Sequence, residues 1–220
     1  MARQGSTAHA LDKLPIDAIL RSVTAAPGNA GGRDALRVSL IDEVARNGRM
    51  GVDYGDQPTF VIMPADFLTG VLDVDILSRL TPEAPEFARA FAGLAYHVTE
   101  GGDHFESVYL RPTNGRKVKP PSPRDQRGIQ YFSYPEWPFD RLREAHPDGR
   151  YEAGADIGPN EWMHLRLEIE PTRVIASVNG QSTLVVNEPK SAAVAGAIGL
   201  FVDIGTEAFF SNLTVSPNGP

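Results

Sequence analysis

The sequence contains no cysteine among its 220 residues. This absence excludes disulfide bonds, thiolate metal sites and a cysteine nucleophile. Basic residues are also scarce, because 21 Lys and Arg stand against 28 Asp and Glu, which gives a formal net charge of −7 at pH 7. Proteins that bind nucleic acid concentrate positive charge against the phosphates, so no nucleic-acid partner is expected.

Long apolar runs are missing as well. Nothing approaches the length of a membrane span, and the opening residues, MARQGSTAHALDKLPIDAIL, hold no apolar stretch of signal-peptide length. We therefore expect no membrane partner and a cytoplasmic location. The sequence also lacks a glycine-rich phosphate loop between a strand and a helix, and a G-x-S-x-G elbow. These absences argue against nucleotide-binding and serine-hydrolase functions.

Metal-binding patterns are sparse. Four histidines are scattered without the close spacing of a zinc-binding helix, so no transition-metal site is expected; they are His97, His104, His146 and His164. A calcium site built from loop carbonyls with Asp103 or Asp203 stays open, because calcium takes oxygen ligands from irregular loops. Otherwise the sequence predicts no cofactor.

Residues 1–33 differ in pattern from the rest of the chain. Pro15 is suited to the first turn of a helix, and a Gly-rich stretch follows Pro27. The apolar residues between them fall at helical spacing, namely Ile16, Ile19, Leu20 and Val23. We expect a short N-terminal helix and a flexible link here, followed by one domain over residues 34–220.

Residues 34–220 show the alternation of apolar and polar residues that is typical of β-strands. Runs such as ALRVSLI, TFVIM, GVLDVDIL, HLRLEIE and AFFSNLTV are short and are mostly separated by Gly, Pro, Asn or Asp. Asn179-Gly180 supplies the positive φ angles of a tight hairpin turn. The sequence predicts an all-β fold, a two-sheet antiparallel sandwich or jelly roll. The irregular, Pro-rich residues 112–159 are expected to rim a pocket.

The order of these motifs resembles a known superfamily. GVLDVDIL, FAGLAYHV, FESVYLRPTNGR, the EW…LRLEI…VNG hairpin and the closing GAIGLF…TEAFFSNLTV together resemble the concanavalin A-like lectin/glucanase superfamily. In particular they are similar to its bacterial laminin G-like branch, near the 3-keto-disaccharide hydrolase domains, over residues 34–216. The resemblance implies a curved sheet whose concave side holds a carbohydrate or another polyhydroxylated molecule. It also implies a cleft position for Glu106.

Two carboxylates stand out in GVLDVDIL. If the apolar residues of this strand face the core, Asp73 and Asp75 share the opposite face, roughly 6–7 Å apart by the strand rise. The arrangement resembles laminarinase-type glucanases, but those continue with a further Glu where this chain has Leu77, Ser78 and Arg79. The alternative is that both aspartates are solvated on a half-exposed strand.

The stretch FESVYLRPTNGR carries unusually many polar groups for a strand. With Val108 and Leu110 turned to the core, Glu106 joins them unless a bulge moves it to the side of Tyr109 and Arg111. On that side Glu106 could act as a general acid or base. The alternative is a structural ion pair of Arg111 with Glu106 or Asp75.

These residues favour a carbohydrate-active enzyme, a glycoside hydrolase or lyase that acts on a small saccharide or glycoside. Its predicted catalytic residues are Glu106, Asp73 and Asp75. The predicted substrate-binding residues offer polar edges or aromatic faces; they are His97, Tyr109, Arg111, Gln130, Tyr131 and Trp137. A non-catalytic lectin-like protein and a cyclase or isomerase of a non-sugar metabolite are the alternatives, and a homo-oligomer stays open.

Overall fold

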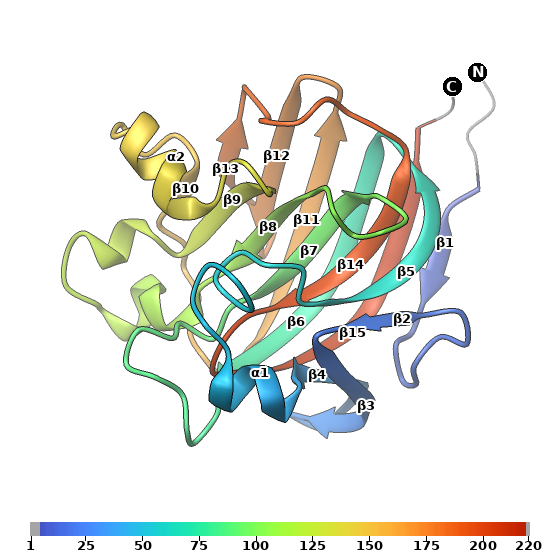
Figure 1. The fold of residues 1–220 in the computed structure, drawn as a ribbon, viewed down its shortest axis with the longest axis horizontal. Helices are drawn as coiled ribbons and strands as arrows, with labels where there is room; N and C mark the ends of the chain where they lie inside the picture. Colours follow the sequence, from blue (N-terminus) through green and yellow to red (C-terminus); the bar gives the residue numbers. More distant parts are fainter. Residues whose placement is uncertain (1–4, 219–220) are drawn as a thin grey trace.

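The computed structural model describes residues 5–218, which form two antiparallel β-sheets packed against each other (Figure 1). The predicted two-sheet sandwich is therefore confirmed. The eight-stranded sheet runs in the order β13 (Gln181–Val186), β12 (Arg173–Val178), β11 (Trp162–Glu170), β6 (Gly70–Leu80), β15 (Thr206–Pro217), β4 (Arg33–Leu40) and β3 (Val23–Ala30), with β1 (Thr7–His9) paired to β15.

The seven-stranded sheet runs in the order β10 (Glu152–Ala153), β9 (Ile129–Tyr134), β8 (Phe105–Leu110), β7 (Ala92–Val98), β14 (Gly196–Val202), β5 (Phe60–Phe67) and β2 (Ile19–Arg21). Short helices occupy the connections: α1 (Asp42–Asn47), α2 (Phe139–Ala145), and the 3-10 turns η1 (Pro112–Asn114), η2 (Arg116–Val118) and η3 (Arg124–Gln126). No helix in the described part of the chain is long and apolar enough to cross a membrane.

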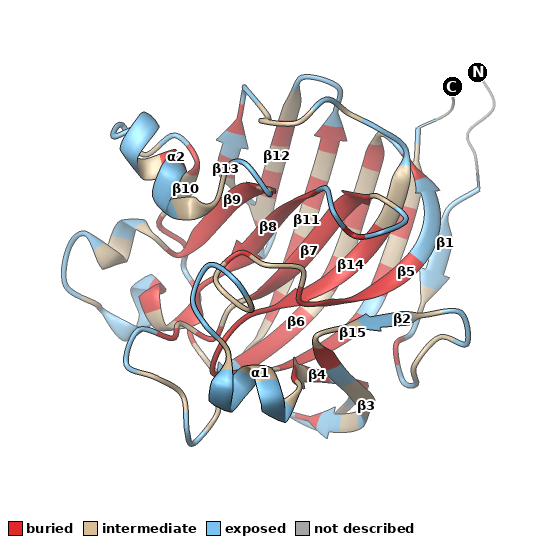
Figure 2. Cartoon of the chain, in the orientation of Figure 1, coloured by how far each residue is buried: buried red, intermediate tan, exposed pale blue. Residues whose placement is uncertain are grey.

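The eight-stranded sheet buries one face only. In β6 the apolar Leu72, Val74 and Ile76 are fully buried, whereas Asp73 and Asp75 between them are partly exposed. The same alternation marks β11 and β12, so these strands change between buried and intermediate along their length in Figure 2. The period-two pattern of the sequence reflects this half-buried geometry.

The central strands of the seven-stranded sheet are buried on both faces. Every residue of β7 and β8 is buried, and both strands are marked as buried from end to end in Figure 2. The inner face of this sheet is the one that meets the other sheet. Ile198 of β14 belongs to the inner face, because it lines a groove together with Leu213 of β15. Leu200, two residues further along β14, pairs with Leu94, and Leu94 pairs with Val108. Val108 therefore points inward.

The outer face of the seven-stranded sheet carries a layer of aromatic rings. Phe105, Tyr109 and Phe132 share this face by strand register, and their rings pack at centroid distances of 5.5–5.7 Å. The loop before β5 and the start of α2 cover part of these rings. A hydrogen bond from the backbone N–H of Phe139 to the Asp56 carboxylate joins these two segments. The connections on this side thus create the environment of a site.

The expected N-terminal helix is wrong. β2 covers Ile19–Arg21 and pairs with β5, and β3 begins at Val23 and pairs with β4. The apolar residues at helical spacing form no buried stripe, since Ile16 is fully exposed and Ile19 is 55% exposed. Pairing with distant strands overrides the local helical pattern. The predicted hairpin at Asn179-Gly180 is confirmed, with φ of 51° and 79° at these two residues.

Candidate functional site

A pocket of about 230 Å³ opens on the outer face of the seven-stranded sheet, where β8 ends and β7 begins. It is smaller than the roughly 300–1,000 Å³ of most small-molecule sites, which suits a single ring. Its walls combine aromatic rings with arginine and aspartate side chains. Among the lining residues are Asp56, Phe87, Phe91, Tyr109, Phe139 and Asp203. The segment 112–159 contributes to the wall through Asn114 and Phe139, so its predicted place beside a pocket is confirmed.

Asp56 is the most unusual group in the pocket. It is 1% exposed and adopts a left-handed backbone conformation with φ of 58°, which is uncommon for a residue other than glycine. Burial, followed by the nearby Asp203 carboxyl, raises the pKa of Asp56 to about 7, although Arg111 and hydrogen bonds from Phe139 and Tyr109 oppose the increase. Asp56 can therefore gain or lose a proton near neutral pH.

Asp203 fixes the loop that carries Asp56. Its carboxylate accepts hydrogen bonds from the backbone N–H groups of Gly55 (3.0 Å), Asp56 (3.0 Å) and Ile204 (2.6 Å). Burial also raises the pKa of Asp203. N–H donors thus surround both oxygens of the carboxylate. Residues 5–218 contain no group of three or more His, Asp or Glu side chains that could hold a metal ion, and a calcium site built from loop carbonyls stays a prediction.

Tyr109 and Arg111 reach the pocket from the end of β8. The Arg111 guanidinium donates to the Tyr109 hydroxyl at 2.7 Å, and burial raises the pKa of Tyr109 well above its usual value. The hydroxyl therefore keeps its proton and can donate it in a hydrogen bond to Asp56, which is one of the contacts that lower the pKa of that carboxyl. The three residues form a chain from guanidinium to hydroxyl to carboxyl.

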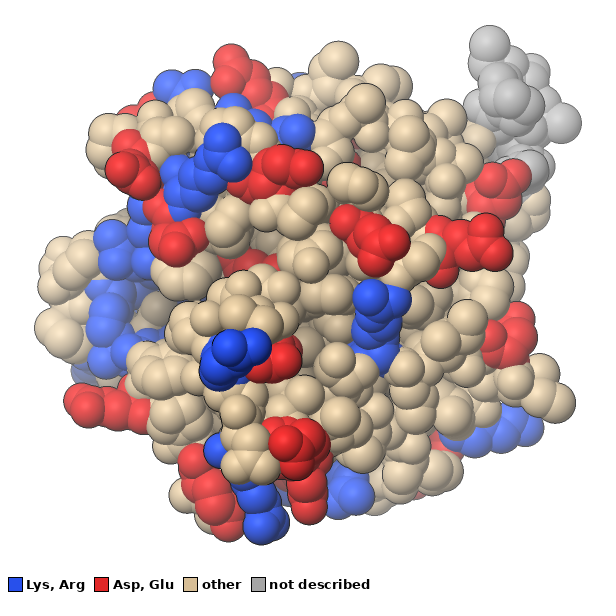
Figure 3. Space-filling model, viewed as in Figure 1, with Lys and Arg blue, Asp and Glu red and all other residues tan. Residues whose placement is uncertain are grey.

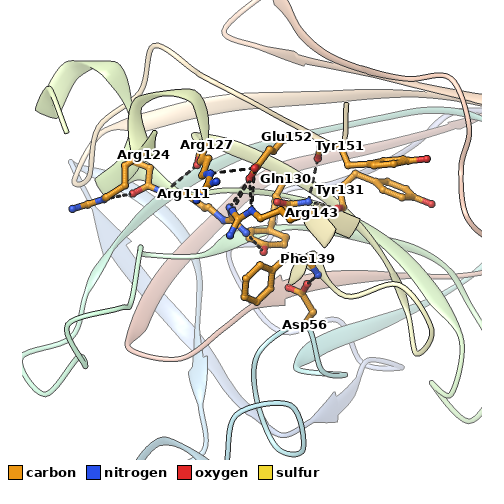
Figure 4. Close-up of polar contacts among 12 residues, drawn as sticks. Asp56, Arg111, Arg124, Arg127, Gln130, Tyr131, Phe139, Arg143, Tyr151 and Glu152 are labelled. Atoms are coloured by element: carbon orange, nitrogen blue, oxygen red, sulfur yellow. Dashed lines mark hydrogen bonds and ion pairs between the residues drawn. The ribbon is translucent and has the colours of Figure 1, made fainter. Parts of the chain in front are cut away.

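Several arginines converge on one carboxylate beside the pocket (Figure 4). Glu152 of β10 is paired with Arg111 at 3.3 Å, Arg127 at 3.1 Å and Arg143 at 2.6 Å. In the close-up Phe139 and Asp56 lie to one side of this cluster, while Tyr131 extends away from it. The space-filling view shows positive side chains gathered over the η1–η3 segment on the left of this face (Figure 3).

Glu106 does not lie in this pocket. Neither pairing of β8 contains a register shift, so Glu106 shares the inner face with Val108 and not the side of Tyr109. There its carboxylate contacts the His97 Nδ1 at 2.9 Å and accepts a hydrogen bond from the Tyr131 hydroxyl. The expectation that Glu106, His97 and Tyr131 line a concave cleft with Tyr109 is therefore wrong.

Asp73 and Asp75 lie on the outer face of the eight-stranded sheet, on the opposite side of the sandwich core from Glu106. Asp75 is bonded to Arg33 (2.7 Å), His164 (2.9 Å) and Asn212 (2.9 Å). The three predicted catalytic carboxylates consequently do not share a cleft. The proposed ion pairs of Arg111 with Glu106 or Asp75 are not formed either, because Arg111 is paired with Glu152.

Gln130 and Trp137 are not part of the pocket wall, and other contacts occupy their side chains. Gln130 lies on the outer face opposite Tyr109, and its amide nitrogen donates to the backbone carbonyls of Tyr131 and Tyr151. The Trp137 ring has the Arg141 guanidinium 4.4 Å and the Lys190 ammonium 4.8 Å from its centroid. These cations leave Trp137 poorly placed to stack on a sugar.

Asp56 is not among the residues that the sequence singles out. Its surroundings come from Phe139 and Asp203, which lie 83 and 147 residues away along the chain. The one local signal is the Gly-rich stretch MGVDYGDQPTF, a loop directly before a buried strand. Loops on a rigid scaffold commonly carry binding groups, and this stretch contains two aspartates and a tyrosine. Nothing local distinguishes Asp56 from Asp53.

Comparison with known proteins gives matches of structure only. No family model matches the sequence, and no curated protein matches it. A Bacillus subtilis protein of unknown function with a galectin-like fold superposes with a TM-score of 0.56 at 11% identity, covering 98% of this chain and 97% of that one. The carbohydrate-binding module CBM66 from Bacillus subtilis gives 0.54 at 12% identity, covering 90% and 97%.

A candidate glycosyl hydrolase from Parabacteroides distasonis also has a TM-score of 0.54, at 11% identity, and covers 96% of this chain and 99% of its own. At such low identities these likenesses establish the fold alone. They agree with the two-sheet β-sandwich of this chain, and membership of the concanavalin A-like superfamily stays a prediction from the sequence. The narrower likeness to 3-keto-disaccharide hydrolase domains stays a prediction.

Proposed function

We propose that the chain is a carbohydrate-active enzyme that binds a saccharide in the Asp56 pocket and uses Asp56 as a general acid or base. One observation carries the proposal: a carboxyl whose pKa is raised to about 7 lines a cavity. General acid–base catalysis is most efficient when the pKa of the group lies near the working pH. Carboxyls of this kind are enriched at catalytic sites.

The pocket suits a sugar ring. Phe87, Phe91 and Phe139 offer apolar faces, while the Asp56 carboxyl and nearby arginines offer polar contacts. Such a mixture fits the C–H face and the hydroxyl edges of a saccharide. Two proteins of similar structure are described as a carbohydrate-binding module and a candidate glycosyl hydrolase, and this supports a saccharide over other small polar ligands.

The arrangement favours a reaction that needs one proton-transferring carboxyl. A retaining glycosidase normally uses two carboxyls about 5–5.5 Å apart, one of them a nucleophile. Asp203 is the second carboxyl in the pocket wall, but its oxygens accept backbone hydrogen bonds. Asp56 would therefore either give its proton to a leaving oxygen or, when ionised, remove one from the substrate. Tyr109 and Arg111 would position the carboxyl through their hydrogen-bonded chain.

The test is turnover of a panel of glycosides, 3-keto-glycosides and oligosaccharides, read by mass spectrometry for the unmodified protein and for Asp56→Asn. We expect product formation to fall by about 10²–10⁴-fold in the variant. Asp17→Asn is the matched control, because Asp17 is exposed on a loop outside the pocket. Unchanged turnover in Asp56→Asn would contradict the catalytic role, and saccharide binding without any product would leave a lectin-like function.

A further inference from the structure

The Asp56 pocket carries an excess of positive charge in an acidic protein. Five arginines line its wall, namely Arg89, Arg111, Arg124, Arg127 and Arg143. Fewer carboxyls balance them: Asp56 and Asp203 in the wall, Glu152 beside it, and Glu86, whose charge acts on Arg89. The whole chain has a formal charge of −7, so this local excess runs against the overall composition. A concentration of one sign of charge in a cavity attracts ligands of the opposite sign.

Two of these arginines have no carboxylate partner. Arg111, Arg127 and Arg143 share Glu152, whereas no carboxylate oxygen of the described residues lies within 4.0 Å of Arg89 or Arg124. Arg124 donates to the Asn114 side-chain oxygen and the Thr113 carbonyl, each at 2.9 Å. Arg89 donates to the backbone carbonyls of Glu86 and Ala88. The acceptors are neutral, and an uncharged side chain could satisfy them.

Both guanidiniums keep donors free for a ligand. The Nε and NH2 groups of Arg89 and the NH1 group of Arg124 make no hydrogen bond within residues 5–218. Burial lowers the pKa of Arg89, and the charges of Arg124 and Arg111 lower it further. The like charges are thus close enough to repel one another, and an anion placed between them would relieve that repulsion.

An apolar ring stands next to these cations. Phe87 lies two residues before Arg89, lines the same pocket and is 43% exposed. Its ring stacks on Tyr54 with centroids 6.3 Å apart, which fixes its orientation. A bare inorganic anion would make no use of this surface. A ligand with both an apolar face and a negative group would use the ring and the guanidiniums together.

We propose that the saccharide bound by this pocket carries an anionic substituent, a carboxylate or a sulfate ester, which is held by Arg89 and Arg124. This inference rests on the proposed function, because it takes the pocket to be a saccharide site. Arg89 and Arg124 determine the substrate class in this scheme, and Phe87 contacts the ring that bears the charge. Asp56 performs the proton transfer at a different atom of the same ligand.

The test measures binding by calorimetry at low salt with four probes: methyl glucuronide, glucose 6-sulfate, methyl glucoside and sodium sulfate. We expect one of the two anionic saccharides to bind at least about tenfold more tightly than the neutral one, because hydrogen bonds between charged groups are among the strong ones. Arg89→Gln and Arg124→Gln should each remove most of that preference, because the affinity for the anionic saccharide falls much further than the affinity for the neutral one. Arg89→Lys and Arg124→Lys should restore part of it.

Arg173→Gln is the matched control, since Arg173 lies on β12 and is not part of the pocket wall. Its preference should equal that of the unmodified protein, and melting curves identify any variant that fails to fold. Equal affinity for charged and neutral saccharides would overturn the inference, as would a preference that survives the double Arg→Gln variant. Sodium sulfate binding as tightly as the anionic saccharides would overturn the role of the ring.

The inference and the proposed function fail in different ways. Binding that prefers anionic saccharides and persists in Asp56→Asn, with no product from either protein, would support the charge specificity and contradict the catalytic role. Turnover that depends on Asp56 but is equally fast for neutral and anionic saccharides would support the enzyme and overturn the charge specificity.

Discussion

Two clusters of a carboxyl and a tyrosine lie on opposite faces of the seven-stranded sheet. On the inner face Glu106 contacts Tyr131 and His97, and on the outer face Asp56 is linked through Tyr109 to Arg111. Both carboxyl residues are 1% exposed. Their chemical groups are similar, but the outer cluster borders the Asp56 pocket, whereas Glu106, His97 and Tyr131 do not line that pocket.

The polar groups of the inner cluster have hydrogen-bond partners within the protein. The His97 Nε2 lies 2.7 Å from the Leu68 carbonyl, which can only accept, so this nitrogen carries a hydrogen. The His97 Nδ1 lies 2.9 Å from the Glu106 carboxyl, so both ring nitrogens have a hydrogen-bond partner. A buried carboxyl with a complete set of partners serves stability, whereas one that faces a cavity is available for chemistry. Access to a cavity, more than residue type, separates the two carboxyls.

Removal of the inner carboxyl should have the largest effect on stability. Glu106→Ala should lower the free energy of unfolding by about 3–5 kcal/mol, because it removes the buried partner of the His97 Nδ1 and the acceptor of the Tyr131 hydroxyl and opens a cavity. Urea unfolding at pH 7 measures the loss. A loss below about 1 kcal/mol would show that the inner cluster does not stabilise the fold to the expected extent.

Asp56, the outer carboxyl, should lower the stability of the folded state as pH rises to neutral. The pKa of Asp56 is raised from 3.8 to about 7 on folding, so between these values the folded state binds more protons than the unfolded state. Its stabilising contribution is fully present below about pH 4 and is lost as pH rises through 7. A shift of about three units corresponds to at most about 4 kcal/mol.

Asp56→Asn removes this dependence, and the variant should gain stability relative to the unmodified protein as pH rises from 4 to 8. Thermal or urea unfolding over that range measures the difference. A part of the slope should persist, since burial also raises the pKa of Asp203. Parallel stability curves for the two proteins would contradict the raised pKa of Asp56.

Substitution of Asp75, on the outer face of the eight-stranded sheet, should have a smaller effect on stability. Burial raises the pKa of Asp75, but hydrogen bonds from Asn212 and His164 and the charge of Arg33 outweigh this and lower it. Its contribution is therefore present above about pH 4 and is lost in more acidic solution. Asp75→Asn should cost about 1 kcal/mol at pH 7 and leave saccharide turnover unchanged. A loss of turnover with normal stability would return Asp75 to the list of catalytic residues.

Trp137 should give the smallest effect. Arg141 and Lys190 already lie against its ring, and it is not part of the pocket wall. Trp137→Leu should change saccharide affinity by less than about twofold, which is well under 1 kcal/mol. A tenfold loss measured by calorimetry, without a change in melting temperature, would mean that the ring contacts the ligand.

The sequence predicts the sandwich because alternation is a local signal. β11 shows it along nearly all of its length and β6 shows it from Gly70 to Ile76, since the eight-stranded sheet has only one buried face. The same signal is lost in β7 and β8, where both faces are buried. For that reason the sequence left two registers open at Glu106. The hydrogen-bond ladder resolves them, because the register shift near His97 lies between β7 and β14 and not within β8.

The candidate site is less predictable than the fold. Tyr109 and Arg111 were expected to share a face, and strand parity alone places them together at the end of β8. Asp56, in contrast, owes its properties to burial and to Asp203, which lies at the far end of the chain. A local pattern contains no information about such distant neighbours. The mistaken grouping of Asp73 with Glu106 arose because one alternating pattern does not say which sheet a strand joins.

The hydrogen bonds from the loop at Gly55 and Asp56 to the Asp203 carboxylate have a consequence for the kinetics of ligand association. Two successive backbone N–H groups of the loop are tied to one buried carboxylate, so the loop pays its ordering entropy during folding and not when a ligand arrives. Association should then be a single step whose observed rate rises linearly with ligand concentration, without the plateau produced by a slow rearrangement. Selectivity among ligands would accordingly be expressed in how long each one stays bound.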